Sequence, residues 1–159
     1  TWSLQQTLQP NDLGDNDWFG KTVALEGDLL VIGAPHMTHV GGDGLGVAYV
    51  YRRDTSGLFQ FEQKLDPGIH RGGLNDVFSW GTIAVEYDLM AVGARFDDNV
   101  NGEDAGAVYL FRYDGAAWQN EAKLFAPDGE AFDSFGVAPL ISQGDVYVGG
   151  LLATGAAPK

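Results

Sequence analysis

The sequence predicts an all-β protein made of β-propeller blades, each with four antiparallel strands. One observation is a repeat: a Phe-Gly or Trp-Gly pair, a Gly-Ala or Gly-Gly pair and an aromatic strand succeed one another, and the two pairs occur three times. Corresponding glycines lie 60 or 61 residues apart between the first two copies, and 55 or 56 between the second and third. Such self-similarity indicates units that bury their faces against their neighbours. The other observation is that short apolar runs alternate with turn residues, and no 3.6-residue period is sustained, which excludes a helical solenoid. A β-sandwich is the alternative, and a repeat of this length fits it poorly.

Each complete unit is predicted to contain four strands joined by glycine-rich or aspartate-rich turns. The first unit, residues 17–65, has expected strands at 19–25, 29–34, 47–52 and 58–65. The second unit, residues 78–124, has them at 80–86, 89–94, 107–113 and 117–124. The polar fourth strand of each unit suits an outermost edge, where charged side chains discourage aggregation.

The two ends of the chain are predicted to hold partial blades within a single segment, 1–159. Residues 1–10 read as the fourth strand of a preceding blade, because Trp2 parallels Phe59 and Trp118. Residues 133–159 hold the first two strands of another blade. A closed propeller needs at least about four blades. We therefore expect either a fragment of a longer protein or chains that complete one another's blades.

The apolar and aromatic positions predict where the blades meet. The runs 29–32 and 146–148 are almost continuously apolar, so both faces of these strands should be covered. Six aromatic residues are expected in the core between blades: Trp18, Phe19, Phe78, Trp80, Phe132 and Phe135. The outer-strand residues Trp2, Phe59 and Trp118 are expected to be more exposed.

Composition limits the classes of function. The net charge is −13 and the pI about 4.2, so the surface should repel nucleic acid and anionic membranes and attract cations. No cysteine is present, which removes disulfides and thiolate chemistry. No stretch reaches the roughly 18 apolar residues of a membrane span, so membrane insertion is not expected. No catalytic motif is found, and the chain is predicted not to be an enzyme.

The best candidate for an ion site is the acidic segment 97–104. Oxygen-bearing side chains alternate at Asp97, Asn99 and Asn101, Gly102 permits a sharp turn, and Asp104 adds a carboxylate. This pattern predicts calcium as a cofactor. The alternative is an acidic loop whose backbone is satisfied by Asx-turns. Zinc at His36 and His39 is disfavoured because too few further ligands are available. By contrast, Asp15, Asp17 and Asp133, which precede Phe-Gly pairs, are expected to cap backbone amides.

The paired motifs resemble FG-GAP repeats, the blades of the propeller of integrin α-subunits and related extracellular proteins. The pairs are Phe19-Gly20 with Gly33-Ala34-Pro35, Trp80-Gly81 with Gly93-Ala94-Arg95, and Phe135-Gly136 with Gly149-Gly150. Integrin-type blades usually carry a calcium loop between the two pairs. Here that junction is Glu26-Gly27-Asp28, Glu86-Tyr87-Asp88 or Gln143-Gly144-Asp145, which is too short to supply the roughly six oxygens that calcium needs.

The resemblance implies an extracellular or cell-surface module for recognition or adhesion, without catalysis. Its expected partner is a protein or a carbohydrate. The alternative is a structural subunit that self-assembles into a ring or an extracellular filament by completing blades between chains.

Overall fold

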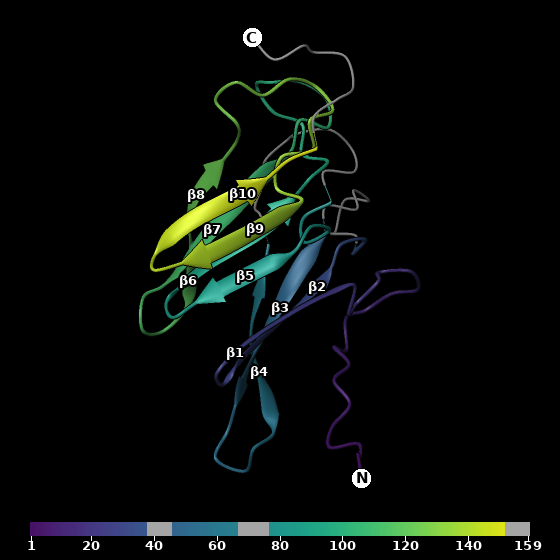
Figure 1. Ribbon diagram of the computed structural model, residues 1–159. Coiled ribbons are helices and arrows are strands. Elements are labelled where there is room, and N and C mark those ends of the chain that lie inside the picture. Colours follow the sequence, from purple (N-terminus) through teal and green to yellow (C-terminus); the bar gives the residue numbers. More distant parts are fainter. Residues whose placement is uncertain (38–45, 67–76, 152–159) are drawn as a thin grey trace.

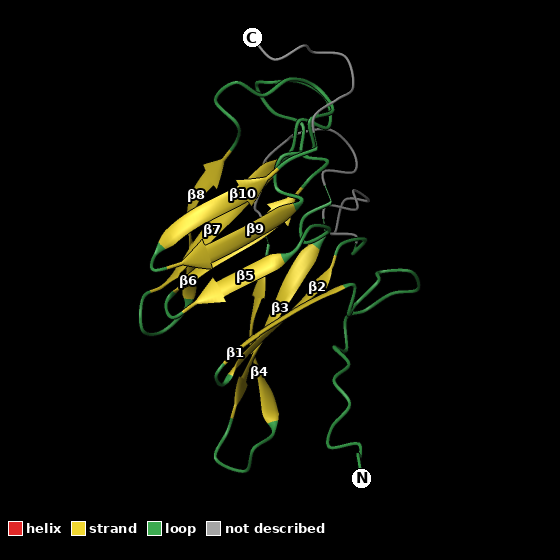
Figure 2. Cartoon of the chain, viewed as in Figure 1, coloured by secondary structure: helices red, strands yellow, loops and turns green. Residues whose placement is uncertain are grey.

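The chain folds into three antiparallel sheets in sequence order. The computed structural model describes residues 1–37, 46–66 and 77–151. The described residues form ten strands and no helix, and the sheets follow one another along the chain (Figures 1 and 2). None of this described part is a helix with the length and apolarity needed to cross a membrane. The prediction of an all-β fold is confirmed.

Two of the sheets are complete blades. The first blade has the order β1-β2-β3-β4, and the second has the order β5-β6-β7-β8. The first comprises β1 (Thr22–Glu26), β2 (Leu29–Ala34), β3 (Val47–Arg53) and β4 (Phe59–Leu65). The second comprises β5 (Ile83–Glu86), β6 (Leu89–Ala94), β7 (Ala107–Tyr113) and β8 (Trp118–Leu124). Each strand pairs with the next one in the chain, as in the blade of a propeller.

The third sheet is a partial blade of two strands, β9 (Ala138–Ser142) and β10 (Asp145–Gly149). The first strands of the three sheets contact one another in succession, β1 with β5 and β5 with β9. The innermost strand of each blade therefore lies beside that of its neighbour, as in Figure 1.

The hairpin between the first two strands of every blade is tight. The closing pairs are Glu26 with Leu29, Glu86 with Leu89 and Ser142 with Asp145. Only two residues lie between the members of each pair, and positive φ angles at Gly27, Tyr87 and Gln143 close the turns. The expectation that these junctions have no room for a calcium loop is confirmed.

The cores form between successive blades. One face of the first blade packs against the facing surface of the second through the following buried side chains: Leu29, Val31, Val50 and Leu65 with Met90, Val92, Tyr109 and Phe111. The opposite face of the second blade packs on the partial blade, where Leu89, Ala91 and Val108 meet Ile141. Each complete blade is thus covered on both faces of its central strands, as the apolar run 29–32 predicted.

The glycines of the repeated pairs allow the backbones of neighbouring blades to approach. A Cβ on Gly93 would overlap the carbonyl oxygen of Gly136, which belongs to the next blade. Within a repeat, Gly20 N–H donates to Gly33 O and Gly136 N–H donates to Gly149 O, both at 3.0 Å. The pairs are therefore packing elements at the inner strands.

A glutamine clamp joins the outer strands of successive blades. Gln63 of β4 donates to the carbonyl of Trp118 on β8 (2.9 Å), and Trp118 N–H donates to Gln63 Oε1 (2.8 Å). Gln6 makes the same two bonds, both 2.8 Å, to the backbone of Phe59 on β4. Residues around Gln6 therefore take the place against the first blade that β4 takes against the second.

Some predictions are corrected. Residues 1–10 occupy the position of an outer strand but form no strand, because no described neighbour pairs with their backbone. Trp118 is 3% exposed rather than exposed, because β4 covers it. Phe132 and Trp18 are exposed by 53% and 45% rather than buried, and Tyr147 faces away from the second blade.

Candidate functional site

The segment before each inner strand has the same unusual backbone in all three repeats. Positive φ angles occur at two alternate residues each time: Asn16 and Trp18, Val77 and Ser79, Phe132 and Ser134. Carboxylates hold two of these turns, since Gly14 N–H donates to Asp17 (2.6 Å) and Glu130 N–H donates to Asp133 (2.7 Å). Amide capping by Asp17 and Asp133 is thereby confirmed. These strained turns project the aromatic residues of the repeat beside the loops that follow β2 and β6.

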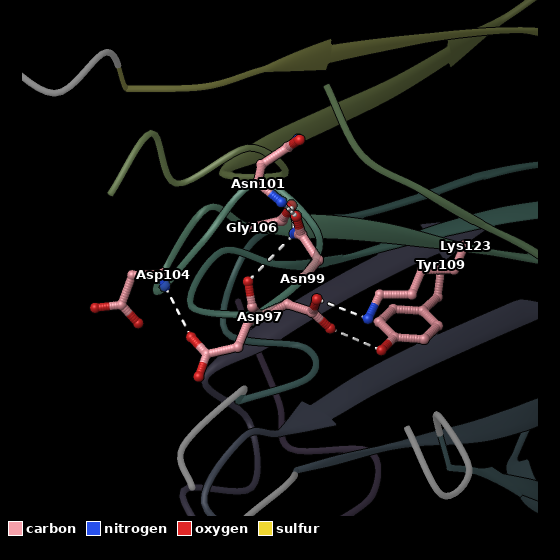
Figure 3. Close-up of polar contacts among 8 residues, drawn as sticks. Asp97, Asn99, Asn101, Asp104, Gly106, Tyr109 and Lys123 are labelled. Carbon is pink, nitrogen blue, oxygen red and sulfur yellow. Dashed lines mark hydrogen bonds and ion pairs between the residues drawn. The ribbon is translucent and has the colours of Figure 1, made fainter. Parts of the chain in front are cut away.

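The predicted calcium loop lies between β6 and β7, and its first residue points into the protein. Asp97 is fully buried, and its carboxylate forms an ion pair with Lys123 Nζ at 2.7 Å. The Tyr109 hydroxyl donates a second bond to this carboxylate at 2.8 Å. Figure 3 shows Lys123 and Tyr109 on one side of Asp97 and Asp104 on the other.

The other predicted ligands bind protein groups in a network of short-range turns. Asn99 Oδ1 accepts the Asn101 N–H at 2.9 Å, and Asn99 Nδ2 donates to the carbonyl of Gly106 at 2.9 Å. Asn101 Nδ2 donates to Ala126 O at 2.7 Å, which attaches the loop to the segment after β8. The Asp104 N–H donates to Asp98 Oδ1 at 2.8 Å.

The structure therefore does not gather Asp97, Asn99, Asn101 and Asp104 around one point. Within the described ranges, no three histidine or acidic side chains are grouped so that they could hold a metal ion. Calcium binding by this loop stays a prediction, which calorimetry on the wild type and an Asp97→Ala variant tests. His39 and Asp43 lie outside the described residues.

Sequence reasoning missed a triad that both blades share. In the first blade, Tyr49 donates to Asp12 (2.9 Å), and Lys64 pairs with the same carboxylate (2.7 Å). Tyr109 and Lys123 repeat the tyrosine and the lysine sixty or fifty-nine positions later, but their acid is Asp97 from the β6–β7 loop. Met37 stands where Asp97 would be in the first repeat, and its sulfur accepts from Tyr49. The recurrence of tyrosine and lysine at one register was the available signal.

Burial and charge shift the pKa values in the first triad. Burial, followed by the bond to Asp12, raises the pKa of Tyr49. The hydrogen bond from Lys64 lowers the pKa of Asp12 below its ordinary 3.8, assisted by Tyr49. This arrangement favours a neutral tyrosine and an ionised aspartate, so the triad is a structural tie that holds residues 1–13 on the first blade.

A cavity of about 360 Å³ opens between the two complete blades at the loop end of the sheets. It is lined by His36 from the loop after β2, by Val77 and Trp80 before β5, and by Phe96, Asp98, Glu103 and Asp104 from the β6–β7 loop. Both blades thus contribute walls, which only their packing brings together.

Aromatic rings form one side of this cavity and continue out of it. The ring centroids of Trp80 and Phe96 lie 5.7 Å apart, and those of Trp80 and His36 lie 5.1 Å apart. Trp18 extends the cluster, 4.2 Å from His36 and 5.1 Å from Trp80. Two cations already lie near these rings: Lys21 Nζ is 5.1 Å from Trp80, and Arg95 Cζ is 4.2 Å from Phe96.

Carboxylates form the other side. Burial raises the pKa of Asp104, the nearby negative charge of Asp98 raises it further, and Arg95 partly offsets the rise. The local field at Asp104 is therefore more negative than its neighbours neutralise. The rings and the carboxylates together can hold a group that has both an apolar surface and a positive charge, or a sugar that stacks on the rings.

The fold and this geometry define a class of protein: a β-propeller repeat protein whose four-stranded blades pack face to face. A family model described as FG-GAP repeat matches residues 2–51 and 71–111, more than half of the chain, so the chain belongs to the FG-GAP repeat family. Repeats of this family are typical of extracellular or surface proteins. Among curated proteins, no match to the chain is found.

Proposed function

We propose that the chain is a noncatalytic recognition module that binds a protein or carbohydrate ligand outside the cell or at its surface. The observation that carries this proposal is the cavity between the two complete blades, where aromatic rings and carboxylates from separate repeats converge. A concave site with apolar walls and a few polar groups is the usual form of a ligand site.

The distribution of hydrogen bonds supports placing the ligand at this cavity rather than in the acidic loop beside it. The loop residues Asp97, Asn99 and Asn101 are used in the fold by Lys123, Gly106 and Ala126. The buried Nε2 atom of His36, in contrast, has no hydrogen-bond partner among the described residues. A buried polar atom that lacks a partner costs free energy, which a bound ligand can recover.

The test is a binding screen of the folded chain against immobilised glycans and immobilised peptides. We expect at least one class to bind, and Trp80→Leu to weaken binding by removing the central ring of the cluster. Tyr147→Ser, on the partial blade, is the control that should bind as the wild type does. A folded sample that binds neither class would contradict the recognition role.

Self-assembly is the second candidate, and exposed apolar faces favour it. Val23 and Leu25 on β1 are 60% and 58% exposed, whereas their counterparts in the second blade, Ile83 and Val85, are covered by the preceding blade. Leu140 of the partial blade is 59% exposed on the side that would face a following blade. The two faces correspond to opposite sides of one blade interface, so copies could stack head to tail.

Solution mass separates the two candidates. Self-assembly predicts a discrete multimer or a fibre that dissociates when Leu25→Glu places a charge in the contact. A monomer over the whole concentration range would contradict self-assembly and leave ligand recognition in place.

A further inference from the structure

We propose that the cavity between the two complete blades receives a cationic side chain, arginine or lysine, from a protein partner. This inference rests on the recognition role proposed above and names its ligand class.

The lining of the cavity carries the first step. Three of its residues are acids, Asp98, Glu103 and Asp104, and they lie opposite the rings of Trp80 and Phe96. A guanidinium or an ammonium on an alkyl stem can contact the rings with its stem and face while its N–H groups donate to carboxylates. A neutral glycan would not require three carboxylates at one small cavity.

The existing cations carry the second step. Arg95 lies over the ring of Phe96 and Lys21 over those of Trp18 and Trp80, so this aromatic surface already accommodates both kinds of cationic side chain. Their presence leaves the field at Asp104 negative, since the pKa of its carboxyl is raised by burial and by Asp98 despite Arg95. A further positive charge at the cavity would therefore stabilise the ionised form.

The unpaired imidazole carries the third step. His36 Nε2 is buried at the cavity and accepts no hydrogen bond from a described residue. A ligand N–H is a suitable donor for this nitrogen when the imidazole is neutral. The overall charge of −13 would also speed the encounter with a basic partner.

The probe is an acetylated and amidated peptide, Gly-Ser-Arg-Ser-Gly, compared with the same peptide containing citrulline, the neutral isostere of arginine. Binding is followed by NMR titration of the labelled chain at low salt. We expect the arginine peptide to bind about fivefold more tightly or better than the citrulline peptide. The amide signals of Trp80, Phe96 and Asp104 should shift, and the pKa of Asp104 should fall as the probe binds beside Asp98, Glu103, His36 and Arg95.

Two variants with equal change in net charge separate local contact from general attraction. Asp104→Asn should reduce the affinity for the arginine peptide about fivefold, whereas Asp145→Asn, on the exposed surface of β10, should leave it nearly unchanged. Preserved amide spectra establish that both variants are folded.

Equal binding of the arginine and citrulline peptides, or equal effects of the two variants, would overturn the inference. If glycans bind at the cavity and the basic peptide does not, the cationic ligand is wrong while the recognition role stands. If nothing binds the folded chain, both are wrong.

Discussion

At the scale of single residues, the two triads make the same contacts with different burial. Asp97 is fully buried and Lys123 is 20% exposed, whereas the acid of the first triad, Asp12, is 51% exposed. Burial strengthens the attraction between two charges and also raises the cost of leaving one of them alone. The same lysine substitution should therefore have unequal effects in the two blades.

We expect Lys123→Met to lower the free energy of unfolding by roughly 3–5 kcal/mol, because it leaves Asp97 buried without a counter-charge. Lys64→Met, the matched control, should cost no more than about 1 kcal/mol, because water reaches Asp12. Urea unfolding followed by tryptophan fluorescence measures both values. Equal losses would show that burial of Asp97 does not set its energetics.

Asp104 predicts a pH dependence of the opposite sign to that of most acids. Its pKa is raised in the folded state, so its favourable contribution is present below its ordinary pKa of 3.8 and is lost as the pH rises through the raised value. Asp104→Asn should therefore be more stable than the wild type at pH 7, with the difference vanishing near pH 3. Urea unfolding at both pH values tests this. A less stable variant at pH 7 would contradict the sign.

At the scale of strands, contact between blades depends on glycine at the inner strands and on glutamine at the outer strands. Gly93 meets the backbone of the next blade, and Gln63 ties β4 to β8 by two hydrogen bonds. Ala122 stands on β8 where Gln63 stands on β4, so the second blade lacks this clamp for a following outer strand.

Gly93→Ala is expected to destabilise the chain by about 2 kcal/mol or more, since the Gly136 carbonyl would have to move to admit the methyl group. The matched control is Gly149→Ala, at the equivalent position of the partial blade, where the nearest atoms to a Cβ lie at 3.8 Å. The control should change stability by less than about 1 kcal/mol. Thermal unfolding of the two variants compares them directly, and equal tolerance would contradict close packing of the inner strands.

Gln63→Ala should cost about 1–3 kcal/mol, because it removes two hydrogen bonds to the partly buried backbone of Trp118. Gln60→Ala, on the same strand, loses only an exposed bond to Asp54 and should cost little. Hydrogen exchange gives a further reading, because the amide of Trp118 should lose protection in the first variant alone. Unchanged protection would mean that the clamp does not hold the outer strands together.

At the scale of the whole molecule, periodicity in the sequence predicts the blades well. The strands at 29–34, 89–94 and 107–113 are confirmed to the residue, since long apolar runs and two-residue turns leave little choice of register. The inner strands begin later than predicted, at Thr22 and Ile83, because the Phe-Gly and Trp-Gly pairs lie in turns with positive φ or bends before them.

The candidate site was less predictable because it depends on how two blades face each other. Asp97 reads as a ligand in a local pattern, and only the fold brings Lys123 and Tyr109 to its carboxylate. Likewise, His36 and Asp104 lie far apart in the chain and meet at the cavity only through blade packing. The Trp118 burial has the same origin, since its cover comes from the preceding repeat.

The most direct test of recognition at the cavity is an NMR titration of the labelled chain with the tightest ligand from the glycan and peptide screen. We predict shifts concentrated at Val77, Trp80, Phe96, Glu103 and Asp104, and saturation with one ligand per chain. Shifts concentrated on β1 or on β9 and β10, with the cavity residues unchanged, would contradict recognition at the cavity and would instead favour contacts through the open blade faces.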